Sequence, residues 1–153
     1  SMTLKDLAGE KIKVCELVIY DTYCIDDTRG KLLNTLSKLS DKDIFPMTSG
    51  CQEICYVNVQ DVSRAYYLCV HSFESITNQL AYVKIPLVSN DVRTLRLYID
   101  DFLKHHPSPP QLNWGELKDN PESLRKIWLS DSAEHLMGWK AETDFSRYVP
   151  KFF

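Results

Sequence analysis

Residues 50–73, GCQEICYVNVQDVSRAYYLCVHSF, decide the fold of this chain. From Ile54 to Val59 the side chains alternate between two faces of an extended segment, which predicts a strand. After Asp61 the apolar residues recur every three or four positions, which predicts an amphipathic helix. This apolar stripe comprises Val62, Ala65, Tyr66, Cys69, Val70 and Phe73. Asp61 stands at the junction, where we expect its carboxylate to cap the helix. A strand that leads directly into a helix is typical of α/β folds.

The composition is that of an ordinary globular domain. We expect residues 1–153 to form one domain, since 153 residues can bury a sizeable core. The formal net charge is −3 and the basic residues are scattered, which argues against a nucleic-acid partner. No apolar run is long enough to cross a membrane, so we expect no membrane association. An odd count of five cysteines indicates a reducing compartment, and we expect a cytoplasmic protein.

Two further segments are predicted strands. Residues 13–20, KVCELVIY, are apolar on both faces apart from Glu16, as in a buried parallel strand. Residues 79–87, QLAYVKIPL, form the second. Residues 21–30, between the first strand and the next helix, are polar and are predicted to form a turn.

Leucines at helical spacing predict a helix over 31–39, and apolar residues from Leu95 to Leu103 predict another. We expect the second helix to begin at Ser89-Asn90-Asp91 and to end before the prolines that follow residue 106.

The remaining elements are short. We expect extended pieces at 44–48 and 111–114, the latter as an edge strand. Asp131 and Glu134 have the spacing of a capping box, and Gly138 stands where a left-handed residue would end that helix. An amphipathic segment over 145–153 closes the chain.

No catalytic or metal site is visible from motifs alone. Cys51 and Cys55 are four residues apart, but the histidines show no matching spacing, so structural thiols are a better interpretation than a zinc site. The five glycines are too dispersed to form a phosphate-binding loop. No tyrosine is followed four residues later by a lysine. The adjacent pairs Asp26-Asp27 and Asp100-Asp101 point apart and form no carboxylate dyad.

Three segments read together resemble the extended short-chain dehydrogenases/reductases, the NAD-dependent nucleotide-sugar epimerase/dehydratase family. Residues 17–33, LVIYDTYCIDDTRGKLL, resemble its (Phe/Tyr)-(Asn/Asp)-x-Tyr-Gly-Pro segment. Residues 47–66, MTSGCQEICYVNVQDVSRAY, resemble its Val-x-Asp-Val-x-x-Ala segment. Residues 115–145, which contain LMGWKAETDF, resemble its closing Leu-Gly-Trp pattern. The segments occur in the family's order and span nearly the whole chain.

The resemblance implies an α/β fold that is only the C-terminal part of a Rossmann-type enzyme: a few sheet strands plus a small mixed α/β lobe that binds the nucleotide sugar. In that family the N-terminal half holds the glycine-rich NAD(P) loop and the catalytic Tyr-x-x-x-Lys. We therefore expect this chain alone to bind no NAD(P) and to catalyse nothing. The resemblance also places strands 13–20 and 79–87 side by side. A sheet cut in this way exposes an edge, which favours a separate Rossmann half or a second copy as partner.

The resemblance implies that, if a site for a nucleotide sugar survives, it lies where residues 21–24, 44–47 and 120–125 converge, and we expect binding there to be weak or lost. The candidate substrate-binding residues are Asp21, Tyr23, Lys31, Phe45, Met47, Asn120, Ser123 and Arg125.

The chain departs from the family pattern at several of these positions. Asn120 replaces the arginine that grips the diphosphate, at a cost of about 1.5–3 kcal/mol. Ser123 replaces the acidic companion of that arginine, and Cys24-Ile25 replaces Gly-Pro. Arg125 and Lys126 are close enough in sequence to compensate.

Two hypotheses follow. The first is that the chain is the substrate-binding portion of an NAD(P)-dependent nucleotide-sugar epimerase, dehydratase or reductase. The second is a non-catalytic relative that acts as an interaction or regulatory module, which the departures favour. The sequence leaves open which of the two is right and which nucleotide sugar is involved.

Overall fold

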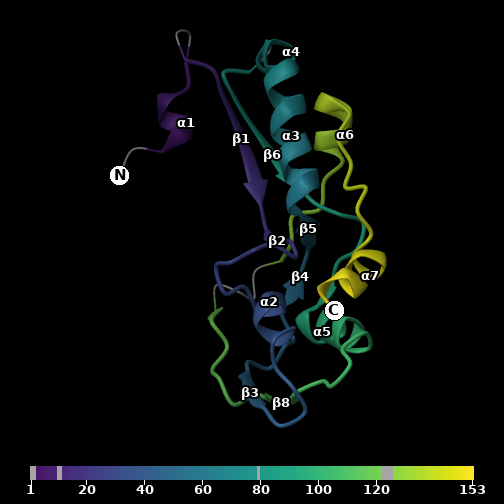
Figure 1. The fold of residues 1–153 in the computed structure, drawn as a ribbon. Helices are drawn as coiled ribbons and strands as arrows, with labels where there is room; N and C mark the ends of the chain where they lie inside the picture. Colours follow the sequence, from purple (N-terminus) through teal and green to yellow (C-terminus); the bar gives the residue numbers. More distant parts are fainter. Residues whose placement is uncertain (1–2, 10–11, 79, 122–125) are drawn as a thin grey trace.

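The computed structural model describes residues 3–9, 12–78, 80–121 and 126–153. The helices are α1 Leu4–Leu7, α2 Leu32–Leu36, α3 Val59–His71, α4 Phe73–Thr77, α5 Leu95–Leu103, α6 Ser132–Met137 and α7 Phe145–Tyr148, and a 3-10 helix η2 covers Val149–Phe152. The strands are β1 Val14–Ile19, β2 Asp21–Tyr23, β3 Ile44–Met47, β4 Glu53–Ile54, β5 Tyr56–Asn58, β6 Tyr82–Leu87, β7 Arg93–Thr94 and β8 Gln111–Trp114. Figure 1 shows β1, β6, α3, α4 and α6 in the upper part and α2, α5, β3 and β8 in the lower part.

The predicted neighbours β1 and β6 pair in parallel along their whole length, from Val14 opposite Tyr82 to Ile19 opposite Leu87. This confirms the pairing that the resemblance implied. Every β1 residue is half-buried, whereas burial on both faces was expected. The reason is that α3, α4 and α6 lie on one side of the pair, and no strand among the described residues pairs with the other edge of β1.

The predicted strand within residues 50–73 is divided at Cys55 into two short strands, β4 and β5. β4 pairs antiparallel with β7, and β5 pairs in parallel with β2. Residues 21–23 are therefore a strand, and the prediction of a turn there was wrong. Helix α3 begins at Val59, because the side chain of Asn58 accepts a hydrogen bond from the Gln60 N–H at 2.9 Å. The prediction that Asp61 caps this helix was wrong.

Asp61 instead ties α3 to the C-terminal segment. Its buried carboxylate accepts hydrogen bonds from the backbone N–H of Thr143 at 2.9 Å and of Glu142 at 3.2 Å. Arg64 pairs with the same carboxylate at 3.2 Å. The Trp139 indole N–H donates to the Asp61 carbonyl at 2.8 Å. One residue thus satisfies backbone donors that lie about eighty positions away in the sequence.

The predicted apolar stripe of α3 is only partly buried. Ala65 and Cys69 face the core, whereas Tyr66 is 53% exposed and Val70 is 72% exposed. Tyr67, beside this stripe, is 60% exposed. Helical spacing gives the side of the helix on which residues lie, but the width of the buried side depends on how many elements pack against it.

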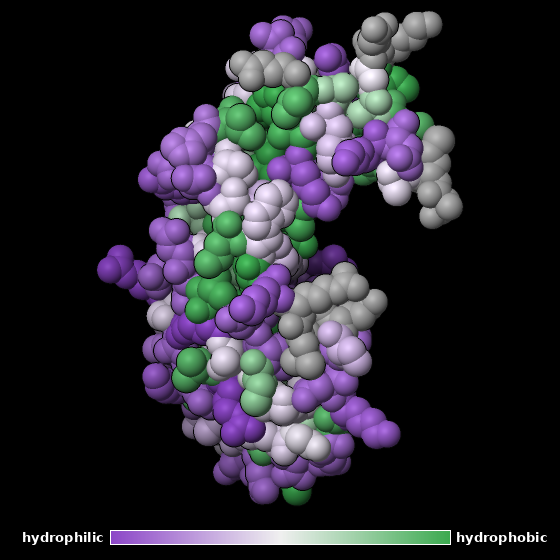
Figure 2. Space-filling view, turned by 180° about the vertical axis from the view of Figure 1, so that it is seen from behind, coloured by the Kyte–Doolittle hydropathy of each residue, from purple (hydrophilic) through white to green (hydrophobic). Residues whose placement is uncertain are grey.

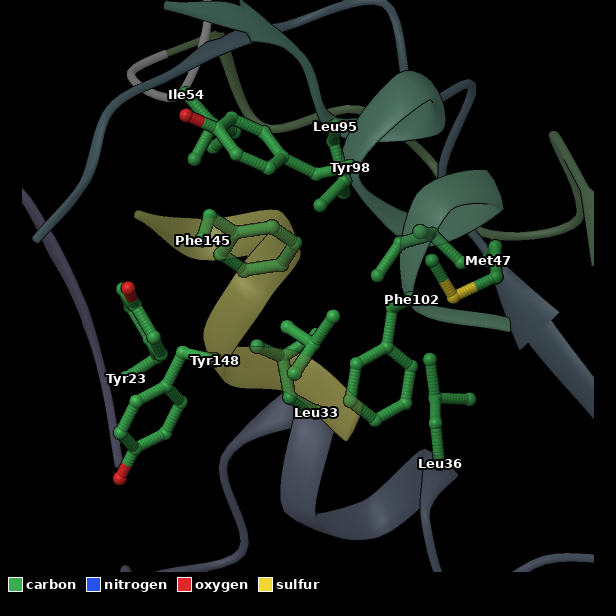
Figure 3. Close-up of a cluster of buried hydrophobic side chains, with 12 residues drawn as sticks. Tyr23, Leu33, Leu36, Met47, Ile54, Leu95, Tyr98, Phe102, Phe145 and Tyr148 are labelled. Carbon is green, nitrogen blue, oxygen red and sulfur yellow. The ribbon is translucent and has the colours of Figure 1, made fainter. Parts of the chain in front are cut away.

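Two hydrophobic clusters support the two parts of the molecule. The upper cluster joins the β1–β6 pair to α3, α4 and α6 and includes Cys69, Ile85 and Trp139. The lower cluster, shown in Figure 3, contains the predicted face of α5, with Leu95, Tyr98, Ile99 and Phe102 buried. Phe145 and Tyr148 of α7 pack into it, as the amphipathic C-terminal pattern predicted.

Helix α5 starts later than expected, at Leu95. Thr94 caps it, and Ser89-Asn90-Asp91 precedes the short strand β7. The predicted end before the prolines is confirmed, since α5 stops at Leu103.

The remaining short elements confirm the sequence predictions only in part. β3 and β8 pair in parallel, which confirms both predicted extended pieces. Gly50 has φ 71°, and a Cβ there would overlap the Trp114 ring on β8, so this position requires glycine. Gly138 ends α6 with φ 67°, as predicted, but Asp131 makes no capping hydrogen bond. Its carboxylate pairs with His135 Nε2 at 3.0 Å instead.

Candidate functional site

A cavity of about 390 Å³ lies just beyond the carboxyl end of β1. This volume is within the range of small-molecule sites. Ligands of parallel α/β sheets bind at the carboxyl ends of the strands. The cavity is lined by β2, the start of α2 and the segment around β4. The lining residues are Tyr20, Asp21, Thr22, Tyr23, Lys31, Leu32, Leu33, Asn34, Gln52, Glu53, Ile54, Tyr56, Leu95 and Ile127.

Three of the predicted substrate-binding residues, Asp21, Tyr23 and Lys31, line this cavity. The Asp21 side chain keeps access to solvent, yet the surrounding protein raises the pKa of its carboxyl group. The charge of Lys31 acts in the opposite direction and lowers that pKa. Glu53 adds a second carboxylate to the lining. Among the described lining residues, Lys31 is thus the cation that could meet a phosphate group.

Tyr23 belongs mainly to the lower cluster, where it is buried. Its ring packs edge-on against Tyr56, Phe145 and Tyr148, with centroids 5.1–5.9 Å apart. Its hydroxyl donates to the Thr143 carbonyl at 3.4 Å. Burial raises the pKa of Tyr23 and of its neighbour Tyr56, so both remain neutral at physiological pH. Together they give the cavity an aromatic wall.

Asn34 is a buried lining residue that sequence reasoning missed. Its amide N–H group donates to the carbonyls of Cys24 and Ile25, at 3.0 and 2.9 Å. These are the positions where the resembled family has Gly-Pro, so Asn34 holds the substituted turn in place. The signal that could have identified it is a polar residue between the leucines of a short amphipathic helix. Gln52 was also missed, and it is a second buried polar residue of the same lining.

The other predicted residues lie outside this lining. Phe45 and Met47 are on β3, and Met47 is buried in the lower cluster. In the structure, Phe45 and Met47 contribute to packing. Their contact with a nucleotide base stays a prediction. Ser123 and Arg125 lie outside the described residues. The neighbour of Asn120, Asp119, accepts a hydrogen bond from the Ser49 N–H at 3.0 Å. The chain after β3 and the residue before Asn120 are therefore in contact. The convergence of the three predicted segments stays a prediction.

A second hollow, of about 790 Å³, lies between residues 88–92 and 129–141. Its charged side chains are engaged in ion pairs: Lys140 pairs with Glu134 at 2.5 Å, and Asp131 pairs at 3.0 Å with His135, which lies outside the lining. The first cavity is the stronger candidate because three of the predicted substrate-binding residues, Asp21, Tyr23 and Lys31, line it, whereas none lines the second. In the part of the chain that the structure describes, no group of three or more His, Cys, Asp or Glu side chains could hold a metal ion.

No protein-family model and no curated protein matches the sequence. Solved structures do match. The dTDP-glucose 4,6-dehydratase of Bacillus anthracis, solved with NAD, has a TM-score of 0.72 at 11% identity, over 91% of this chain and 43% of its own. The UDP-glucose 4-epimerase of Thermus thermophilus, also with NAD, has a TM-score of 0.70 at 16% identity, over 92% and 45%. RMD from Pseudomonas aeruginosa, with NADPH, has a TM-score of 0.68 at 12% identity, over 94% and 47%.

The chain has the fold of about half of a nucleotide-sugar epimerase or dehydratase. The predicted resemblance and the predicted fold class are thereby confirmed. These three matches span 43–47% of the solved chains, which agrees with the expectation of a C-terminal half. Within the described residues, no helix has the length and apolar character needed to cross a membrane.

Proposed function

We propose that this chain is the substrate-binding half of an NAD(P)-dependent nucleotide-sugar epimerase, dehydratase or reductase, and that the 390 Å³ cavity receives the nucleotide sugar. The observation that carries this proposal is the position of that cavity. It lies at the carboxyl end of the parallel strand β1, in a fold shared with enzymes of this class. The odd number of free cysteines supports a cytoplasmic location.

The lining suits a ligand with both apolar and charged parts, but it suits a diphosphate poorly. Lys31 offers one charge-assisted contact, and the carboxylates of Asp21 and Glu53 oppose a second negative charge. Asn120 provides no charge where the resembled enzymes have arginine. Loss of one charge-assisted contact weakens binding about tenfold or more. We therefore expect millimolar affinity for a nucleoside-diphosphate sugar.

Turnover would require a second, dinucleotide-binding half, and β1 offers the place for it. Cys15, Leu17 and Ile19 pack toward the upper cluster, so alternation puts Val14, Glu16 and Val18 on the opposite face. The view from behind shows patches of hydrophobic residues over the upper part of the molecule, on the side away from α3 and α6 (Figure 2). We propose that a Rossmann half adds a parallel strand to the free edge of β1. It would supply NAD(P), which accepts and returns the hydride, and the catalytic tyrosine.

The experiment is an NMR titration of the chain with UDP-glucose. We expect shifts at residues 21–23 and 31–34, weaker shifts after Lys31→Ala, and stronger binding after Asn120→Arg. Lys38→Ala, which removes an exposed lysine outside the cavity, is the matched control and should leave the titration unchanged. The absence of shifts in both the wild-type chain and Asn120→Arg would contradict the proposal.

The alternative of a non-catalytic interaction module rests on a different observation. Tyr66, Tyr67 and Val70 form an exposed apolar strip on α3, each more than half accessible. Such a strip is typical of surfaces that contact another protein. Under this alternative, a Tyr67→Glu variant would change the sedimentation behaviour of the chain, while UDP-glucose would cause no shifts in either form.

A further inference from the structure

Two cysteines in the upper part of the molecule, one on a strand and one on a helix, lie in direct contact. Cys15 is on β1 and Cys69 is on α3, fifty-four positions apart, and their Sγ atoms are 3.3 Å from each other. All five cysteines are among the described residues, and no other pair of them has sulfur atoms in hydrogen-bond contact. A disulfide has an S–S distance of about 2.05 Å, so closure needs a shift of only about 1.3 Å.

We propose that Cys15 and Cys69 form a reversible disulfide that locks the edge strand β1 onto helix α3. Neither cysteine lines the nucleotide-sugar cavity, and this modification site does not rest on the proposed function. Because β1 leads into Tyr20 and β2, which line the cavity, the lock also fixes one wall of that cavity.

The reduced pair is protected while the structure stays closed. Burial, together with the hydrogen bond to Cys69, raises the pKa of the Cys15 thiol to about 12, so little thiolate is present at neutral pH. Cys69 is almost fully buried, whereas Cys15 is half-buried on a strand with one free edge. Cys15 is therefore the point of entry, and the rate of oxidation should follow the local opening of β1.

The oxidant is a small disulfide such as oxidised glutathione. The Cys15 thiolate attacks one sulfur of the reagent, whose S–S bond breaks and releases one thiolate. The Cys69 thiolate then attacks the Cys15 sulfur of the mixed disulfide and releases the second thiolate. Two electrons pass from the cysteine pair to the reagent, and the two protons of the cysteines go to the released thiolates or to solvent.

The remaining cysteines provide controls. Cys55 is fully buried, and its sulfur accepts a hydrogen bond from the Ser89 N–H at 3.2 Å. Cys51 is exposed and has no sulfur neighbour within contact among the five cysteines, so it should form only a mixed disulfide with the reagent.

The test is incubation of the full chain with oxidised glutathione, followed by alkylation and peptide mass mapping. We expect a peptide pair linked through Cys15 and Cys69, reversed by dithiothreitol, and a Tm about 5–10 °C higher in the oxidised form. Cys51→Ser should retain the linked pair, whereas Cys15→Ser and Cys69→Ala should lose both the pair and the Tm shift. Wild-type protein that yields only mixed disulfides, or a pair that involves Cys24 or Cys55, would overturn the proposal.

Discussion

Replacement of Asp61 by asparagine tests the main tertiary connection of this fold. The carboxylate accepts from two backbone N–H groups and from Arg64, while only one oxygen remains in the amide. The new NH₂ group would face a backbone donor. Each hydrogen bond to a charged group contributes about 1.5–3 kcal/mol. We therefore expect Asp61→Asn to lower the free energy of unfolding by about 2–4 kcal/mol at pH 7, or Tm by roughly 5–15 °C.

The effect should depend on pH in a defined direction. Burial favours the neutral acid, but the hydrogen bonds from Thr143 and Glu142 and the contact with Arg64 outweigh it, so the pKa of Asp61 lies below its ordinary 3.8. The carboxylate then contributes fully above that ordinary value, and its contribution is lost as the pH falls through the lower folded-state pKa. The difference between wild type and Asp61→Asn should shrink on going from pH 5 into that acidic range.

Urea unfolding followed by circular dichroism measures both quantities. Asp100→Asn, on the exposed side of α5, is the matched control and should change the stability by less than about 0.5 kcal/mol. An Asp61→Asn variant as stable as this control, or a difference that does not change with pH, would refute the reasoning.

Three further predictions concern other parts of the chain. Gly50→Ala should cost about 2 kcal/mol or more, because the Cβ would overlap the Trp114 ring at a positive φ, whereas Gly9→Ala should be nearly neutral; thermal melts compare them. Asn34→Ala should cost about 1–2 kcal/mol in urea unfolding through two lost hydrogen bonds, and the exposed Asn90→Ala should cost little. The chain alone should bind no NAD(P); a stoichiometric calorimetric isotherm would contradict this.

The strongest sequence predictions concerned local pattern. The apolar faces of 13–20 and 79–87 predicted two strands, the spacing from Leu95 to Phe102 predicted the buried side of α5, and Gly138 predicted the end of α6. These features succeed because side-chain periodicity and left-handed glycine conformations are properties of the local backbone. The family resemblance added the pairing of the two strands, which periodicity could not give.

The sequence predicted the candidate site less well. Asp21, Tyr23 and Lys31 line the cavity, but Met47 is a core residue, and Asn34 and Gln52 went unnoticed. The sequence does not show which backbone carbonyls a polar residue in a helix or loop will contact. Asn34 gains its role only when α2 packs beside the turn at residues 24–25.

The sequence by itself determined several of the strands and helices and some of the positions where they end, because those choices rest on neighbours a few residues apart. Tertiary structure alone decided that 21–23 pairs as a strand, that Asn58 rather than Asp61 caps α3, and that Tyr66 and Val70 remain exposed. Asp61 shows the physical reason. Its carboxylate could satisfy nearby helix N–H groups or distant ones, and the packing of the C-terminal segment brings Glu142 and Thr143 within its reach.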